Sequence, residues 1–177
     1  RPSTATCIAV SPPARRAWAS AASGPQSRSF SRSLPMLTRR CSTVPRAPGL
    51  YLHIPFCSAV CPYCDFSVLR AGVPARKRFV EHLVAEVALA AREWRDPRPF
   101  DTVYFGGGTP SLLPPEDLQR VLGACRPRLA LATPWIFLEA NPEDVTPDAS
   151  AAWRDLGVRT LSLGVQSFSD EALRFLG

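Results

Sequence analysis

The sequence has 177 residues, 46% of them hydrophobic, which is enough to bury the core of one sizeable domain. All of its excess positive charge lies in residues 1–49, which contain eight arginines and no acidic residue, so residues 50–177 offer no basic surface for a nucleic acid. No apolar run approaches the roughly 18 residues that a membrane-spanning helix needs, so neither nucleic-acid binding nor a membrane span is expected.

Residues 1–49 are predicted to form a disordered leader that stays outside the fold. They are rich in Arg, Ser, Ala and Pro and show no sustained apolar period, a composition typical of an organelle transit peptide. Met36 is the only methionine and the chain does not begin with one, so the segment is equally well explained as translated sequence upstream of a true start. The second reading places the protein in the cytoplasm, and the first in the mitochondrial matrix.

From residue 50 onward, strand patterns and helix patterns alternate. Short apolar and β-branched runs predict the strands, and amphipathic spacing, prolines in the first turn and capping residues predict the helices. In chain order, the expected elements are a strand at 50–55, a helix at about 74–95, a strand at 101–105, a helix beginning at Pro114 or Pro115, a strand at 135–139, a helix capped by Thr146, a strand at 160–165 and a helix opened by Ser169.

This alternation predicts an α/β fold. Because crossovers between neighbouring parallel strands are right-handed, the four β/α units should form part of a parallel β/α barrel. Four units leave an open edge and an incomplete interior, which barrels ordinarily close by adding further units. We therefore expect residues 50–177 to be the N-terminal part of a larger domain.

Three cysteines follow the first strand with the spacing C-x3-C-x2-C: Cys57, Cys61 and Cys64. Thiolates are the ligands of iron–sulfur clusters, and so short a loop can surround one cluster. Three local cysteines leave one iron of a [4Fe–4S] cluster open to an outside ligand. A zinc site, which ordinarily needs a fourth Cys or His, and bare structural cysteines remain as alternatives. The other cysteines, expected to be incidental, are Cys7 and Cys41 in the leader and Cys125 on an apolar helix face.

Each of the four strands ends in an unusual group of residues. After the cysteine loop of the first strand, these groups are Gly106, Gly107, Gly108 and Thr109, then Glu139 with Asn141, then Gln166 with Ser167. In β/α barrels the chemistry lies at the carboxyl ends of the strands, so the four groups should face one site. The glycine run lacks the Lys-Ser/Thr ending of a P-loop, and Pro110 and Ser111 follow where a dinucleotide-binding helix would begin.

Five motifs in this order resemble one group of the radical S-adenosylmethionine (SAM) superfamily. That group contains the oxygen-independent coproporphyrinogen dehydrogenase and the HemW-type haem chaperone. The motifs are YLHIPFC at 51–57, the cysteine motif ending in CDF at 64–66, FGGGTPS at 105–111, LEANP at 138–142 and LGVQSF at 163–168. The resemblance covers residues 50–177.

The resemblance implies a role for each matching residue. Cys57, Cys61 and Cys64 would hold three irons of a [4Fe–4S] cluster, and SAM would bind the fourth. The expected contacts with the cofactors are Tyr63 near the adenine, Gly107 and Gly108 at the methionine amine, Glu139 at the end of SAM nearest the strands, Gln166 at a ribose hydroxyl, and Tyr51 and Phe66 near the cluster. His53 is expected in the core or behind the site, and His82 on a helix surface.

The same resemblance leaves two functions open. In the dehydrogenase, a radical made from SAM abstracts hydrogen from a propionate side chain, which leads to decarboxylation. In the chaperone, haem is bound and passed to a client protein. The dehydrogenase usually carries a further cysteine two residues after the third, where this chain has Phe66, so the resemblance favours the haem chaperone. A zinc-bound structural module is the third alternative.

Overall fold

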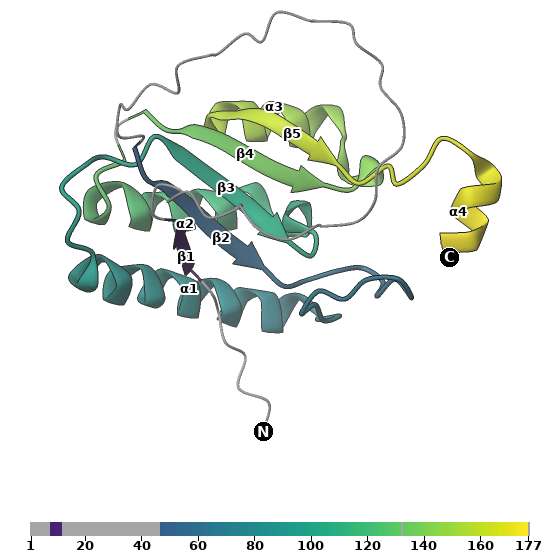
Figure 1. Ribbon diagram of the computed structural model, residues 1–177, viewed down its shortest axis with the longest axis horizontal. Coiled ribbons are helices and arrows are strands. Elements are labelled where there is room, and N and C mark those ends of the chain that lie inside the picture. Colours follow the sequence, from purple (N-terminus) through teal and green to yellow (C-terminus); the bar gives the residue numbers. More distant parts are fainter. Residues whose placement is uncertain (1–7, 12–46, 132, 177) are drawn as a thin grey trace, which may run out of the picture.

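The computed structural model describes residues 8–11, 47–131 and 133–176. They form a five-stranded sheet in the order β1-β2-β3-β4-β5 (Figure 1). The strands are β1 (Ile8–Ser11), β2 (Gly49–Ile54), β3 (Thr102–Gly107), β4 (Trp135–Ala140) and β5 (Val158–Leu163). The helices are α1 (Val73–Glu93), α2 (Pro115–Arg128), α3 (Pro147–Leu156) and α4 (Asp170–Leu176), with short 3₁₀ turns η1 (Pro110–Leu112) and η2 (Pro142–Asp144).

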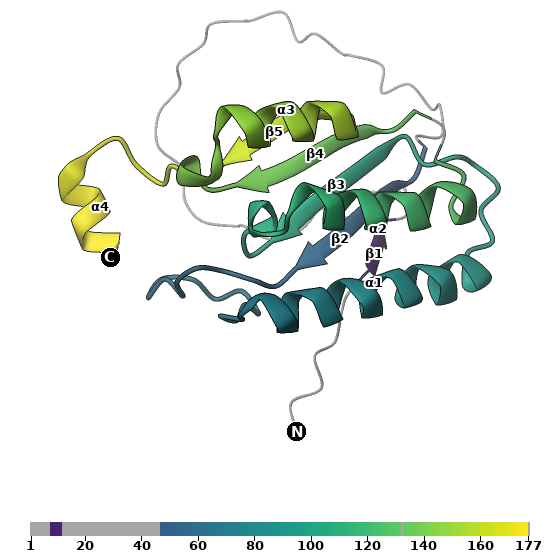
Figure 2. The same ribbon diagram turned by 180° about the vertical axis from the view of Figure 1, so that it is seen from behind.

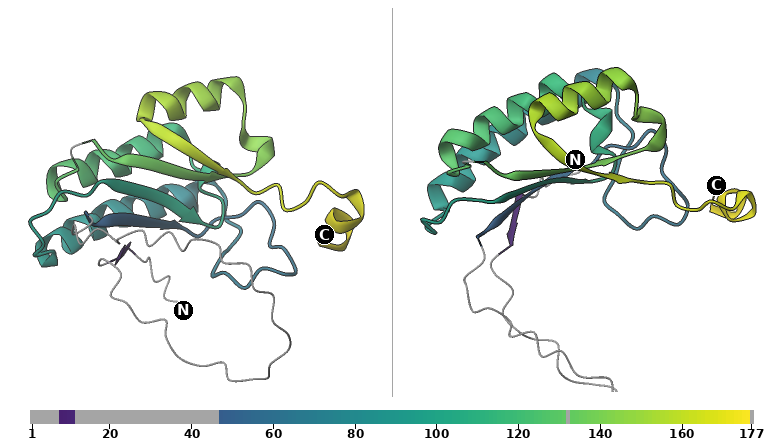
Figure 3. Two further views of the ribbon diagram at one scale, coloured as in Figure 1. Left: turned by 45° about the horizontal axis from the view of Figure 1, so that its top comes forward. Right: turned by 90° about the horizontal axis from the view of Figure 1, so that it is seen from above.

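Strands β2 to β5 are parallel, and α1, α2 and α3 all lie on one face of the sheet (Figures 2 and 3). Side chains alternate between the faces of a strand, so every second residue of β2 meets the helices. Leu50, Leu52 and Ile54 are buried under the helices, whereas Tyr51 and His53 lie on the other face, which no helix of the described residues covers. The predicted partial β/α barrel is confirmed.

The helices begin close to the predicted residues, because local signals define their starts. Helix α1 buries Val80, Leu83 and Val87, which recur at helical spacing. Helix α3 begins where the Thr146 side chain accepts a hydrogen bond from the backbone N–H of Ala149. Cys125 is fully buried in α2, as predicted, and burial raises the pKa of its thiol to about 12.

Three features differ from the sequence predictions. Strand β5 begins and ends two residues earlier than predicted, because residues 164–165 already belong to the loop that leaves the sheet. The turns η1 and η2 were not predicted. The prediction that residues 1–49 stay outside the fold is wrong for Ile8–Ser11, which pairs antiparallel with β2 and covers its edge. The rest of that segment up to residue 46, including Cys7, Met36 and Cys41, lies outside the described residues.

Helix α4 lies apart from the layered body (Figure 1). Two aromatic side chains in and beside it are almost fully exposed, Phe168 at 97% and Phe175 at 88%. Among the described residues, no helix is long and apolar enough to cross a membrane.

Candidate functional site

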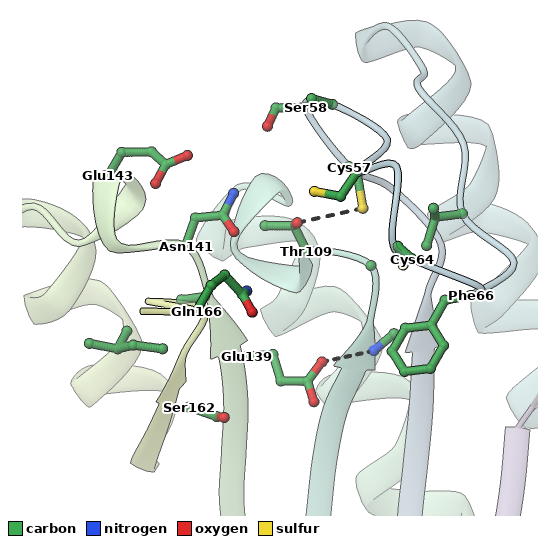
Figure 4. A pocket seen from close by; sticks show the side chains of 18 of the residues that line it. Cys57, Ser58, Cys64, Phe66, Thr109, Glu139, Asn141, Glu143, Ser162 and Gln166 are labelled. Atoms are coloured by element: carbon green, nitrogen blue, oxygen red, sulfur yellow. Dashed lines mark hydrogen bonds between the residues drawn. The ribbon is translucent and has the colours of Figure 1, made fainter. Parts of the chain in front are cut away.

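A cavity of about 490 Å³ opens at the carboxyl ends of β2 to β5 (Figure 4). Its walls come from the cysteine loop, the glycine turn (residues 106–108, which begins within the end of β3), the end of β4, and the end of β5 with the segment after it. Nine of the ten residues predicted for the site line it: Cys57, Cys61, Tyr63, Cys64, Phe66, Gly107, Gly108, Glu139 and Gln166. The structure thus brings together residues from four separate strand ends.

The cysteine loop projects from the end of β2 and is closed at its base by backbone hydrogen bonds. The N–H of Cys57 donates to Leu69 O at 3.2 Å, and the N–H of Leu69 donates to Pro55 O at 2.8 Å. Within the loop, the N–H of Cys64 donates to Cys61 O at 3.1 Å, which turns the chain between these two cysteines. The three thiols of the loop are free and half-buried.

The Cys57 thiol contacts the residue that follows the glycine run. The Thr109 hydroxyl donates to its Sγ at 3.7 Å (Figure 4). Burial raises the pKa of Cys57; the hydrogen bond from Thr109 opposes this, and the neighbouring Cys64 and Cys61 add to the rise. Among the described residues, no three His, Cys, Asp or Glu side chains converge to hold a single metal ion. The ligands of a four-iron cluster are spread around it and need not converge on one point. Thiolates are the usual ligands of such clusters, and three thiols lie on one loop at one cavity.

The glycine turn lies directly against the cysteine loop, because it carries no side chains there. Gly107 has φ +118°, and a Cβ atom on it would lie 2.6 Å from the His53 ring. A Cβ atom on Gly108 would lie 2.6 Å from Phe56 O and 2.9 Å from the Sγ of Cys57. His53 therefore packs behind the turn, as predicted, and residues with side chains at 107 or 108 would push the turn away from the cysteines.

Glu139 points from β4 toward the glycine turn, and both of its carboxylate oxygens accept hydrogen bonds (Figure 4). The Tyr104 hydroxyl donates to Oε1 at 2.7 Å, and the N–H of Gly107 donates to Oε2 at 3.0 Å. Burial and the bond to Glu139 raise the pKa of Tyr104 to about 12. Tyr104 was not predicted as a site residue, although its place two residues before Gly106 puts the two residues on the same face of the sheet.

Gln166 lines the cavity in a left-handed backbone conformation, with φ 62°. Residues other than glycine rarely adopt this conformation, and such strain is typical of functional sites. Ser162 of β5 also lines the cavity and was not predicted, whereas Ser167 does not line it.

The aromatic residues fall into two groups. Tyr63 and Phe66 are exposed side chains of the cysteine loop that line the cavity, and a hydrogen bond with Cys61 raises the pKa of Tyr63. Tyr51 is the one predicted site residue that does not line it. Its ring stacks on Tyr104 with centroids 5.9 Å apart, and its hydroxyl lies 3.3 Å from Nδ1 of His53. His82 is exposed on α1, as predicted.

The Radical SAM superfamily matches residues 51–177. The chain is 42% identical over 134 residues to the heme chaperone HemW of Escherichia coli (strain K12), an alignment that covers 73% of this chain and 34% of that protein. It is 35% identical over 129 residues to the anaerobilin synthase of Escherichia coli O157:H7, covering 72% of this chain and 29% of that one.

Among solved structures, the fold is similar to that of coproporphyrinogen III oxidase (HemN) from Escherichia coli, described as a radical SAM enzyme. The TM-score is 0.64 at 26% sequence identity, and the match covers 71% of this chain and 29% of the solved one. The chain spans about a third of the length of the curated relatives that it matches. With the family match over residues 51–177 and the cavity at the carboxyl ends of the strands, this chain belongs to the radical SAM superfamily.

Proposed function

We propose that Cys57, Cys61 and Cys64 bind three irons of a [4Fe–4S] cluster and that SAM binds the fourth. One observation carries the proposal: three free thiols on one loop line the same cavity as the glycine turn and the polar ends of β4 and β5. The family implies both cofactors, and the thiol ligand set fits a cluster.

The residues around the cysteines suit the binding of SAM. Gly107 and Gly108 bring backbone close to the cysteine loop and would contact the methionine amine. Glu139 would accept a hydrogen bond from SAM, and Gln166 would contact a ribose hydroxyl. When bound, the reduced cluster supplies one electron that cleaves SAM, and the protein residues orient SAM and limit the access of water.

For the full-length gene product we propose the function of a HemW-type haem chaperone, which binds haem and passes it to a client protein in the cytoplasm. The proposal is supported by the 42% identity to a heme chaperone and by Phe66 at the position where the dehydrogenase carries cysteine. Haem would bind in regions outside this chain, because the chain matches about a third of that relative.

The alternative is an oxygen-independent coproporphyrinogen III dehydrogenase. It is favoured by the similarity of the fold to a coproporphyrinogen III oxidase, at 26% identity. The lower identity to this structure than to the heme chaperone, and Phe66 in place of cysteine, both argue against the dehydrogenase. A zinc-bound structural module is the remaining alternative, and iron and sulfide analysis distinguishes it from a cluster.

The cluster assignment is tested by anaerobic reconstitution of the full-length gene product with iron and sulfide. We expect about four irons per chain in the wild type and loss of the cluster in Cys61→Ala, because no nearby thiolate can replace the missing ligand. Cys125→Ala is the matched control, because this thiol is buried in α2 away from the cavity and the variant should keep the iron. Stoichiometric zinc without sulfide in protein purified without oxygen would contradict the assignment.

The chaperone function is tested by two assays on the same reconstituted protein. It should bind haem, and it should form no protoporphyrinogen from coproporphyrinogen under reducing, anaerobic conditions with SAM present. Phe66→Cys alone should not create the decarboxylation activity, because the substrate would need regions outside this chain. Formation of protoporphyrinogen by the wild type would favour the dehydrogenase.

A further inference from the structure

We propose that Tyr104 is a positioning residue, whose hydroxyl fixes the Glu139 carboxylate in the orientation that binds SAM. The inference rests on the proposed contact between Glu139 and SAM. Tyr104 does not line the cavity itself, so it would act through Glu139 and not through a contact of its own.

The geometry leaves Glu139 little freedom. Its two oxygens are held from two directions, by the Tyr104 hydroxyl at 2.7 Å and by the backbone N–H of Gly107 at 3.0 Å. The backbone bond alone would allow the carboxylate to rotate about its own axis. The second bond removes that rotation, since the Tyr104 ring is itself fixed between Tyr51 and Phe137, with centroid distances of 5.9 and 5.7 Å.

Gly106 gives the Tyr104 ring the space that this arrangement needs. A Cβ atom on Gly106 would lie 2.7 Å from Cε1 of Tyr104 and 2.9 Å from Cε2 of Tyr51. Each contact is shorter than a van der Waals separation, so any side chain at position 106 would displace both rings. Gly106 therefore leaves space for the two tyrosine rings, whereas Gly107 and Gly108 allow the backbone to approach the site closely.

The arrangement also defines what Glu139 can bind. A carboxylate has about four acceptor positions, and the two donors from the protein occupy two of them. The remaining positions accept hydrogen bonds only, so the part of the ligand at Glu139 must be an N–H or O–H donor. A tyrosine whose pKa is raised to about 12 remains a donor at neutral pH. Glu139 is thus held ready to accept from an ammonium or hydroxyl group of SAM.

The test is Tyr104→Phe in the full-length gene product, reconstituted anaerobically, with SAM affinity measured by titration. The ring and its stacking remain, and only the hydroxyl is lost. We expect SAM to bind about 3- to 10-fold more weakly, while the iron content, the cluster spectrum and the melting temperature stay close to the wild type. The control is Thr102→Val, which removes a hydroxyl at the amino-terminal end of the same strand. It should leave SAM affinity unchanged.

A double-mutant cycle with Glu139→Gln separates positioning from packing. If Tyr104 acts through Glu139, then Tyr104→Phe should weaken SAM binding much less in the Glu139→Gln background than in the wild type. Equal SAM affinity of Tyr104→Phe and wild type, or fully additive effects of the two substitutions, would overturn the inference while leaving the proposed function intact. If the wild type carries an intact cluster but does not bind SAM, both the inference about Tyr104 and the proposed function are overturned.

Discussion

At the scale of single residues, the site depends on positions where a side chain is forbidden or strained. Gly108 approaches the cysteine loop very closely. A Cβ atom on it would lie 2.6 Å from Phe56 O and 2.9 Å from the Sγ of Cys57. Gln166 shows the opposite case, in which a polar side chain is kept despite its left-handed backbone. Both residues line the cavity, so we expect substitutions at these two positions to change iron content or SAM binding.

Gly108→Ala should lower the iron content after reconstitution. The added methyl group meets backbone and a cysteine thiol, neither of which can move without shifting the ligand loop. Gly123→Ala is the matched control, because its Cβ would meet nothing within 4 Å and lies in α2, where alanine stabilises a helix by about 0.5–1 kcal/mol. Iron content should be measured together with the melting temperature. Equal iron content in the two variants would show that the close approach at Gly108 is not needed.

Gln166→Ala should weaken SAM binding and leave the cluster intact. The loss of one hydrogen bond, worth about 0.5–1.5 kcal/mol, corresponds to about 2- to 12-fold in affinity. Titration with SAM and the absorption spectrum of the cluster measure the two properties separately. An unchanged affinity would show that the segment after β5 does not contact SAM.

At the scale of elements, helices were predicted more accurately than their connections, because helix signals are local. Thr146 with Pro147 defined the start of α3 from the sequence alone. The cysteine motif was found in the same way, since its three cysteines lie in one loop. The bond between Tyr104 and Glu139 could not be predicted, because it depends on the register of β3 and β4 and on the space above Gly106.

Thr146→Ala should destabilise the protein by about 1 kcal/mol. The substitution removes the side-chain oxygen that accepts from the Ala149 N–H at 3.1 Å and leaves that donor without its cap. Urea unfolding at equilibrium measures the change in the free energy of unfolding. Thr133→Ala, an exposed threonine in the loop before β4, should change it by much less. If Thr146→Ala lowers the free energy of unfolding no more than Thr133→Ala does, the capping role of Thr146 is contradicted.

At the scale of the whole molecule, the described residues that line the cavity all lie between Cys57 and Gln166. Strand β1 adds four residues to the outer edge of the sheet, beside β2. This strand was missed because Ile8–Ser11 is too short a run, in a segment of leader-like composition, to reveal its long-range pairing with β2. The parallel order of β2 to β5, in contrast, followed from the alternation of strands and helices.

Removal of residues 1–46 from the full-length gene product, with a new initiating Met, should leave cluster loading unchanged. The edge of β2 loses its antiparallel partner, so we expect a small loss of stability and a greater tendency to aggregate. Iron and sulfide content and light scattering measure the two effects. A truncated protein that folds but takes up no iron would show that the segment before residue 47 does more than cover an edge.

The place of the cysteine loop in the chain has a consequence for biosynthesis. All three thiols leave the ribosome directly after β2, whereas the opposite wall of the cavity is complete only when Gln166 has been made. At about 5–20 residues per second, the interval is on the order of ten seconds. During that interval the nascent chain carries all three cysteines of the loop without the opposite wall of the cavity. Until that wall is made, the thiols are open to oxidation and to other metals, so we expect selective cluster insertion only after translation has passed β5.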